Sequence, residues 1–441
     1  MKKITVFLIG LILVSAATAG DVITLTWDQV IGIGLKQNLD LRIMRQDYRN
    51  QSLNQWKAAM DFLPTVNYSF RAVNNIELPV MVFMGRSFRV GTKYNFSHVF
   101  QAQLPIFLGG LRFANYSIQK NSKRSLKALL KGKESDIALK SVEAYFQVIL
   151  SNDLVRVNQR AVDAARANFE QVQKFYNTGA ASRLDLLRAK TRLSQSLPAL
   201  TSAENNRKMA VENLKYLLNF NVQDSIVVLD SLKRMDFLKD FATLPLEKLQ
   251  EIALKNRSDL KSLDFRKKAV GAQKIIAGSH FLPQIVLSAD VQHQAYLDNS
   301  KVQWNDYTRA KSASIGVQFP LFEGGKRIIE MQQAFIQNKK ITLQLAQMKR
   351  AVLLNVKNSF NSFKEARQNL QSLKQAFKQA KETLRLANLT YKEGLSTQVD
   401  VLNAQAAFTA SELQYRQGIF KYNVAQLELL KAIGKLETLW Q

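Results

Sequence analysis

The chain has 441 residues and carries 62 lysines and arginines against 35 aspartates and glutamates, a formal net charge of +27. It has no cysteine, which excludes disulfides, lipid-modified cysteines and thiolate metal sites. A chain this basic could bind nucleic acid, but its Lys, Arg and Gln are spread along helical faces without a recognised reader motif. We therefore favour a solvated basic surface, with anionic lipid as one surface it could face, and expect no nucleic-acid partner.

Residues 1–19 have the pattern of a signal peptide. Lys2 and Lys3 precede an apolar run over residues 4–14, and Ala17-Thr18-Ala19 is a small-x-small cleavage site. The alternative is a membrane anchor, but the run is much shorter than the ~20 residues that a spanning helix needs. The mature chain is therefore expected to begin at Gly20 and to be periplasmic, secreted, or in the outer membrane by a route other than helices.

The chain contains an internal duplication. Three short motifs recur at nearly constant offsets of 219, 215 and 215 residues. They are Phe62-Leu63-Pro64 with Phe281-Leu282-Pro283, residues 104–110 with 319–325, and Tyr176-Asn177-Thr178-Gly179 with Tyr391-Lys392-Glu393-Gly394. We therefore predict a first repeat over residues 20–219, a joining segment over 220–244, a second repeat over 245–434 and a tail over 435–441.

Each repeat is expected to open with a helix. Thr26 can cap the first helix, where the carboxylate of Asp28 also favours the positive helix end. Pro245 lies near the first turn of the second helix. Both helices must end before a proline, at Pro64 and Pro283.

Two β-hairpins are predicted next, at about residues 63–107 and 282–322. In each, apolar residues alternate with polar residues over about ten positions, the length that a tilted transmembrane strand needs. The alternative is a soluble sandwich, but four strands make too small a sandwich to hold the helices that follow. Four strands also cannot close a barrel, so the chain must oligomerise to remove its sheet edges in lipid.

Long helical hairpins are predicted over about residues 112–219 and 327–434. The first helix of each would have 65 residues and run about 100 Å. Apolar residues recur at spacings of three and four along these helices, and this stripe, which includes Phe360 and Phe377, predicts coiled-coil packing. Residues 221–243 break the helical period, and residues 225–229 within them predict a short strand; this segment is expected to lie partway along the helical shaft.

The turns of the two helical hairpins carry the most informative polar positions. Gly179 and Gly394 predict left-handed turns, and Ser182 and Ser396 are expected to cap the return helices. Six residues after each glycine comes an aspartate, at the equivalent positions 185 and 400. An acidic residue in the first turn of a helix offsets the macrodipole, so this local role is an alternative to a functional site.

No catalytic or metal-binding constellation is recognised. The three histidines, His98, His280 and His293, are too scattered in the sequence for a metal cluster, and the nine methionines are dispersed. The Gly-Ile-Gly at residues 32–34 and the Gly-Gly-Lys at 324–326 lack the rest of a nucleotide-binding loop. We therefore predict no enzymatic activity and no cofactor.

These features together resemble the TolC family of outer-membrane efflux and secretion channels. The resemblance covers essentially the whole mature chain and rests on the duplication, the Leu25-Thr26-Trp27-Asp28 opening, the proline-ended strand pairs and both helical turns. It implies an α+β membrane protein in which a duplicated unit joins two transmembrane β-strands to long coiled-coil α-helices. It also implies a homotrimer, with a twelve-stranded outer-membrane β-barrel on a periplasmic α-helical barrel.

The resemblance also implies partners and a periplasmic constriction. A periplasmic adaptor and an inner-membrane pump would dock at the turns. Asp400 matches an acidic constriction position, and Asn403 matches a second one that is acidic in the family pattern and neutral here. The positions that match the adaptor-contacting turns are Gly179, Ala180, Gly394 and Leu395.

A latch that holds the family channel closed matches Tyr391 and Asp185. Its basic member falls at Ser396, so a salt-bridged latch is in doubt here, and a hydrogen-bonded latch or one that recruits Arg183 remains open. The predicted function is the exit duct of a tripartite efflux pump or type I secretion system, which conducts substrates passively and opens at the turns. The alternative is a trimeric envelope tether or adhesin stalk that does not conduct.

Overall fold

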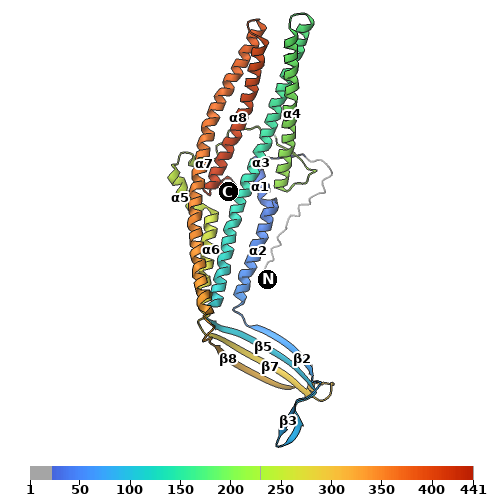
Figure 1. Cartoon of the computed structure of the whole chain (residues 1–441), viewed down its shortest axis with the longest axis vertical. Coiled ribbons are helices and arrows are strands. Elements are labelled where there is room, and N and C mark those ends of the chain that lie inside the picture. Colours follow the sequence, from blue (N-terminus) through green and yellow to red (C-terminus); the bar gives the residue numbers. More distant parts are fainter. Residues whose placement is uncertain (1–21, 229, 441) are drawn as a thin grey trace, which may run out of the picture. The chain divides into compact units, whose positions relative to one another are not determined.

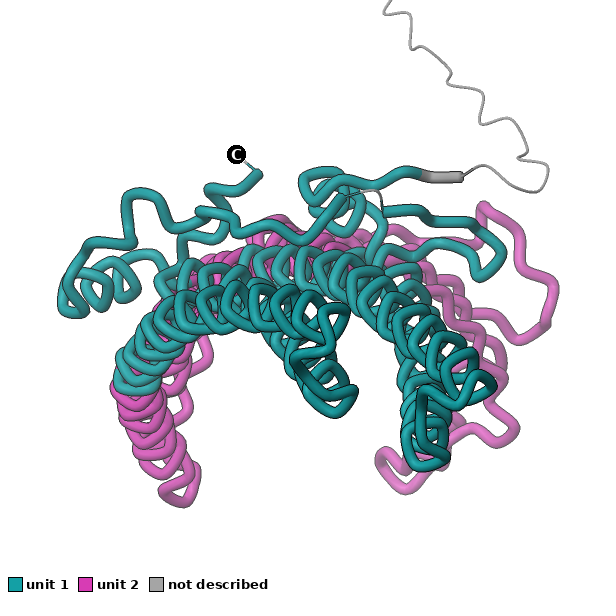
Figure 2. Tube along the Cα trace, turned by 90° about the horizontal axis from the view of Figure 1, so that it is seen from above, with its two compact units in different colours: residues 1–44, 131–257, 350–441 teal, residues 45–130, 258–349 magenta. Residues whose placement is uncertain are grey.

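The computed structural model describes residues 22–228 and 230–440, so the predicted signal peptide lies outside the described residues. The chain divides into two compact units (Figure 2). Unit 1 comprises residues 1–44, 131–257 and 350–441, and unit 2 comprises residues 45–130 and 258–349. Each unit therefore contains residues from both predicted repeats.

The duplication is visible in the helices (Figure 1). Helices α3 (Leu111–Asn177) and α7 (Lys326–Lys392) both have 67 residues and are offset by 215 positions at both ends. The shorter helices repeat in pairs as well. These pairs are α1 (Trp27–Gln37) with α5 (Leu246–Asn256), α2 (Leu39–Met60) with α6 (Ser258–Ser279), and α4 (Arg183–Leu218) with α8 (Gln398–Ala432). Short 3-10 helices are η1 (Lys239–Phe241), η2 (Trp304–Asp306) and η3 (Leu436–Leu439).

The prediction of a single opening helix in each repeat is wrong, because each is split in two. Thr26 caps α1, and its backbone N–H donates to Gln29 Oε1 at 3.1 Å. Asn38 then leaves the helical region, and its side-chain amide donates to the carbonyl of Leu217 at 2.9 Å while its Oδ1 accepts from the N–H of Leu41. Asparagine competes with the helix ladder in this way, so α2 starts as a new helix. The second repeat breaks at Arg257, and Pro245 is the N-cap of α5, next to its first turn as expected.

Unit 2 contains a four-stranded antiparallel sheet. Its strands are β2 (Thr65–Asn74), β5 (Tyr94–Leu108), β7 (Gln284–Leu297) and β8 (Thr308–Gln318), in the order β2-β5-β7-β8. The hairpins of the two repeats are therefore joined through β5 and β7. Within the described residues, β2 and β8 form the edges of this sheet.

The two faces of the sheet differ in chemistry, as the alternation predicts. Cross-strand partners share a face, and one face carries Tyr68 opposite Phe100, and Leu287 opposite Ile315. These four side chains are exposed in the chain. The other face carries mainly polar partners, listed as Asn67 with Gln101, Gln103 with Ser288, and Asp290 with Ser312.

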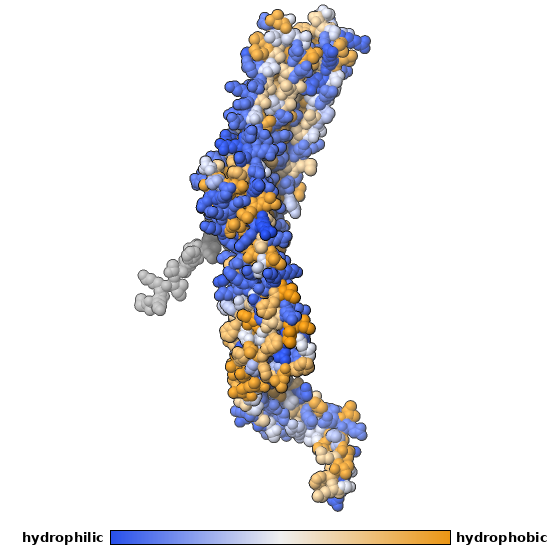
Figure 3. All heavy atoms as spheres, turned by 60° about the vertical axis from the view of Figure 1, so that its left-hand side comes forward, coloured by the Kyte–Doolittle hydropathy of each residue, from blue (hydrophilic) through white to orange (hydrophobic). Residues whose placement is uncertain are grey.

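A second small hairpin in unit 2 was not anticipated from the sequence. It comprises β3 (Val80–Phe83) and β4 (Arg86–Arg89), within the connection between β2 and β5. Met84 and Gly85 both have positive φ, as the tightest hairpin turns require. The apolar side chains of this hairpin are exposed, and the lower end of Figure 3 is correspondingly rich in apolar residues.

The same arginine contact joins the sheet to the long helix in both repeats. Arg112, at the start of α3, donates to the carbonyls of Asp61 and Ile106 at 3.2 and 3.1 Å. Arg327, at the start of α7, donates to the carbonyls of His280 and Leu321 at 3.1 and 3.0 Å. Each guanidinium also lies over a phenylalanine ring of its own repeat, which adds a cation–π contact.

Unit 1 is held together by the predicted apolar stripe. In α7, Val356, Phe363 and Leu370 are buried, and the ring of Phe377 stacks on Phe408 and Tyr415 of α8. The corresponding stripe in α3 is buried at most of its positions. Tyr176, which follows Val172 at the same spacing near the end of α3, is an exception with 40% of its surface exposed. The stripe therefore packs each helical hairpin but stops short of the first turn.

The joining segment packs within unit 1. Strand β6 (Ser225–Val227) pairs in parallel with β1 (Val22–Thr24), which bears out the short predicted strand. Further along, the N–H groups of Met235 and Phe237 donate to Asn423 Oδ1 and Gln426 Oε1 of α8, both at 3.0 Å. Both of these α8 amides are fully buried, so their hydrogen bonds to the segment satisfy groups that water cannot reach.

Candidate functional site

The candidate site consists of the two turns at the ends of the long helices, both in unit 1. We call residues 176–189 the first tip and residues 391–404 the second tip. Gly179 and Gly394 have φ of +78° and +76°, so the predicted left-handed turns are confirmed. A Cβ on either glycine would meet nothing within 4 Å, so backbone conformation rather than space requires glycine here.

The two aspartates close identical capping boxes. At the first tip, Ser182 Oγ accepts from the N–H of Asp185 at 3.1 Å and donates to its carboxylate at 2.7 Å. At the second tip, Thr397 Oγ1 accepts from the N–H of Asp400 at 3.3 Å and donates to its carboxylate at 2.7 Å. The prediction that Ser396 caps α8 is therefore wrong, because Thr397 is the residue 215 positions after Ser182. The helix-start role fits both aspartates in the single chain.

Asp400 remains open to a second role. The hydroxyl of Thr397, and then its backbone N–H, donate to the carboxylate and lower the pKa of Asp400 below its usual range. Asp400 and Asn403 are both exposed, whereas Val401 and Ala404 are buried in the chain. The first two turns of α8 thus present a charged carboxylate and then an amide on the free face of the helix.

The predicted latch residues are not joined to one another across the tips. Asp185 bonds to Ser182 and lies 3.6 Å from Arg188, both within the first tip. Ser396 Oγ accepts from Thr390 Oγ1 at 3.1 Å, within the second hairpin. Among the described residues, no hydrogen bond or ion pair links Asp185 or Arg183 to Tyr391 or Ser396.

A different pair joins the second tip to the first hairpin, and sequence reasoning missed it. Gln398, the first residue of α8, is buried, and its Nε2 donates to Asn168 Oδ1 on α3 at 3.3 Å. The residue at the equivalent position of the first tip is Arg183, which is exposed. The contrast between a glutamine and an arginine at equivalent positions was the available sequence signal.

A network of buried charges also joins α3 to α8. Arg160 donates to Glu412 at 2.8 Å, Arg416 lies 3.4 Å from Asp153, and Arg156 pairs with Asp153 as well. The side chains of Asp153 and Glu412 are only 5% and 4% exposed. A buried carboxylate without a partner is strongly unfavourable, so Arg160 and Arg416, which each reach a carboxylate on the other helix, hold the two hairpins in register.

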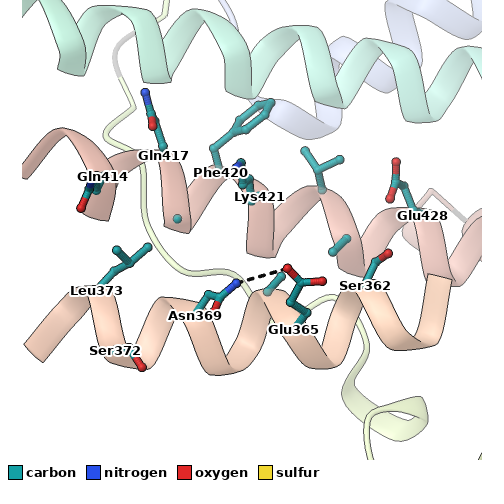
Figure 4. Close-up of a pocket in the computed structure, with 14 residues that line it drawn as sticks. Ser362, Glu365, Asn369, Ser372, Leu373, Gln414, Gln417, Phe420, Lys421 and Glu428 are labelled. Atoms are coloured by element: carbon teal, nitrogen blue, oxygen red, sulfur yellow. Dashed lines mark hydrogen bonds between the residues drawn. The ribbon is translucent and has the colours of Figure 1, made fainter. Parts of the chain in front are cut away.

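A groove of about 540 Å³ lies between α7 and α8 (Figure 4). Its labelled side chains come from both helices, and Asn369 Nδ2 donates to Glu365 Oε1 at 3.5 Å. Burial, and then the charge of Glu143, raise the pKa of Glu428 at one end of the groove. The described lining residues include no histidine.

The structure brings two histidines together that the sequence separates widely. His98 on β5 lies directly opposite His293 on β7. Still, no group of three or more metal-binding side chains is found in the part of the chain that the structure describes. Within residues 22–228 and 230–440, no helix is both long and apolar enough to span a membrane.

Comparison with known proteins decides the family. The family model for "Outer membrane efflux protein" matches residues 30–219 and 249–435, which together exceed half of the chain. The chain belongs to the outer membrane efflux protein family. One matched segment lies in each repeat, which agrees with the duplication of the helices and strands.

Individual relatives of this outer membrane efflux protein are distant. It is 23% identical over 312 residues to outer membrane protein TolC of Escherichia coli (strain K12), a match that covers 69% of the chain and 62% of TolC. Its fold resembles a membrane protein from Pseudomonas aeruginosa, with a TM-score of 0.81, 16% identity and coverage of 92% and 93%. The Campylobacter jejuni CmeC outer membrane channel follows with a TM-score of 0.79, 15% identity and coverage of 93% and 86%.

These comparisons confirm the predicted TolC-like family and outer-membrane localisation. The family assignment also confirms that the protein is not an enzyme. The roles of single tip residues stay predictions.

Proposed function

We propose that this protein is the trimeric exit duct of a tripartite efflux pump or type I secretion system. Substrates would pass through it passively, across the periplasm and the outer membrane. The observation that carries the proposal is a four-stranded sheet with one exposed apolar face, one polar face and two edge strands. In lipid, such a sheet requires closure with other copies.

Three copies would supply twelve strands, an even number that a transmembrane barrel can close. β8 of one protomer would pair with β2 of the next. The face with Gln101, Gln103 and Asp290 would line a wet lumen, and the face with Tyr68 and Ile315 would contact lipid. This assignment follows the usual distribution of polar and apolar residues in channel-forming barrels.

The tips would form the periplasmic entrance. In a trimer, three copies of Asp400 would face one another, with Asn403 one turn further along α8. The exposure of both side chains in the single chain supports this arrangement. A ring of carboxylates would favour cations at the constriction.

The latch in this protein would differ from a salt bridge at the tips. Ser396 is held by Thr390, and Asp185 by Ser182, so Tyr391 or Arg183 would have to reach a partner across the tips. A periplasmic adaptor would contact the exposed turns at Gly179, Ala180, Gly394 and Leu395, and an inner-membrane pump would drive export through that adaptor.

Single-channel conductance in planar bilayers tests this function. The purified protein is expected to have the mass of a trimer in detergent and to give discrete conductance steps that rise when the tips are opened by substitution. A monomer or an even-numbered assembly would contradict the trimer. A stable trimer without conductance would favour the non-conducting tether or adhesin stalk.

A further inference from the structure

The apolar face of the sheet changes in character along the strands. In one cross-strand row, His98 lies opposite His293, and His293 lies opposite Arg309. In the next row on the same face, Val291 lies opposite Lys311. Beyond Lys311, the β8 residues on this face are apolar, namely Ala313, Ile315 and Val317. The basic residues of this face are therefore confined to one end of β8.

Aromatic side chains gather at the same end. His98 bonds through its two ring nitrogens to Tyr68 Oη at 2.8 Å and to Tyr307 Oη at 3.1 Å. Trp304 stacks on His293 with ring centroids 5.8 Å apart and also lies near Tyr307. Tyrosine and tryptophan collect where the apolar part of a membrane meets its headgroups, because each has an apolar body and a polar tip.

In the proposed barrel, the direction of the strands would place this end on the outside of the cell. The opposite ends of β2, β5, β7 and β8 continue into helices, whereas Trp304 and Tyr307 lie in the connection between β7 and β8. In an outer-membrane protein with periplasmic helices, that connection is extracellular. Arg309 and Lys311 then lie at the level of the outer-leaflet headgroups.

The charges of Arg309 and Lys311 are available on this face. Both side chains are exposed, and neither takes part in an ion pair among the described residues. The one carboxylate of β7, Asp290, lies on the polar face, where Ser312 donates to it. An anion that approaches from the lipid side would therefore meet two cations and no opposing carboxylate from β7 or β8.

We propose that Arg309 and Lys311 bind the phosphate groups of a phosphorylated outer-leaflet lipid, whose acyl chains lie against Ala313, Ile315 and Val317. Guanidinium matches phosphate oxygens with two parallel hydrogen bonds, and the ammonium of a lysine supplies a second point charge. Trp304 and Tyr307 mark the boundary between headgroup and chains. This inference rests on the proposed barrel, which would carry three such sites.

The test measures lipid binding to the purified, detergent-solubilised protein by native mass spectrometry. The probes are a bisphosphorylated lipid A and the same lipid with its phosphates removed. The test variant combines Arg309→Gln with Lys311→Gln, and the matched control combines Lys374→Gln with Lys378→Gln on the exposed surface of α7. Both variants lose the same formal charge, so a non-specific effect of net charge would appear in both.

Wild type is expected to prefer the bisphosphorylated lipid, and the Arg309/Lys311 variant to bind it about 30-fold more weakly, since each basic residue near an anionic surface contributes roughly fivefold. The α7 control should bind within about twofold of wild type. Arg309→Lys should retain most of the binding, and it serves as a second variant if the double one assembles poorly. Equal binding of both lipids by wild type, or equal losses in both double variants, would overturn the proposal.

Failure of the lipid site is distinguishable from failure of the proposed function. Conductance of the same variants is measured in bilayers of neutral phospholipid, where the phosphorylated lipid is absent. Normal conductance without a preference for phosphorylated lipid would contradict only the proposed lipid site. Absence of a trimer or of conductance in wild type would contradict the proposed exit duct, on which the lipid site depends.

Discussion

The first and second tips repeat one backbone design at an offset of 215 residues but differ in how they are attached. Both have a left-handed glycine and a capping box closed by aspartate. At the second tip, however, Gln398 is buried and bonded to Asn168 of the other hairpin, whereas its counterpart Arg183 is exposed. Duplication thus preserved the residues that make each turn, while the contacts that hold the turns in place diverged.

This comparison also separates two kinds of residue. Turn-forming residues satisfy their own backbone, so they are needed in both copies. Residues that attach a tip depend on what lies beside it, so they are free to differ between copies. We therefore expect equivalent substitutions in turn-forming residues to have similar effects, and equivalent substitutions in attaching residues to have different ones.

The largest expected effect comes from breaking the packing of the second hairpin. Phe377→Asp would place an unpaired charge against the rings of Phe408 and Tyr415, at a cost of several kcal/mol. Little assembled protein should then reach the outer membrane. Quantifying trimer in membrane extracts checks this, with Phe377→Leu as a control that keeps an apolar side chain and should lose far less. Equal trimer levels for Asp and Leu would show that Phe377 is not part of the packing seam.

The sequence was sufficient to predict those parts of the fold that depend on local or periodic signals. The glycine turns, the strand alternation and the stripe around Phe377 each have a spacing that predicts them. The break at Asn38 could not be predicted, because it depends on a carbonyl of Leu217 that is distant in sequence. The hairpin β3–β4 was missed because its strands have only four residues each, and its apolar side chains are exposed among the described residues.

The candidate site was predictable to a similar extent. The positions of Asp185 and Asp400 follow from the repeat, and so does their capping role. The bond between Gln398 and Asn168, and the pairing of Arg160 with Glu412, cross 230 and 252 residues of sequence. A single sequence carries no signal for which residues on two long helices will meet, so these attachments required the structure.

Valine at either tip glycine should have the next largest effect, and the effect should be alike in both copies. A left-handed conformation costs a residue with a Cβ roughly 1–2 kcal/mol, and nothing nearby would otherwise resist the side chain. We expect Gly179→Val and Gly394→Val to speed amide hydrogen exchange at their own turns. Asn tolerates this conformation, so Gly394→Asn is the control. Matching exchange rates for Val and Asn would refute the conformational explanation.

Substitution of Gln398 should have a smaller effect that differs between the tips. Gln398→Leu removes the hydrogen bond to Asn168, which is worth about 1 kcal/mol, and should free the second tip from α3. The open probability of single channels should then rise about fivefold. Arg183→Leu changes the equivalent exposed residue and should leave gating unaltered. If both variants raise the open probability equally, attachment through Gln398 does not distinguish the tips.

The smallest expected effect concerns the charge of Asp400, and Asp185 provides its matched control. Both aspartates close the same capping box, so asparagine at either position should disturb the helix start similarly. If Asp400 also lines a constriction, Asp400→Asn alone should reduce cation preference and block by trivalent cations, measured from reversal potentials in a salt gradient.

The pH dependence of Asp400 sharpens this test. Thr397 lowers the pKa of Asp400, so its carboxylate stabilises the fold above the pKa of the unfolded chain, and this contribution is lost as the pH falls through the lower, folded value. Carboxylates brought close together in a trimer would raise one another's pKa and oppose this shift.

Cation preference should therefore be full at neutral pH in wild type and fade in acid, whereas Asp400→Asn should show no such change. Because Asn403 leaves a single acidic ring, the preference should be weaker than in a channel with two rings. Identical selectivity in Asp400→Asn and Asp185→Asn at every pH would leave both aspartates as helix caps and place the constriction elsewhere on α8.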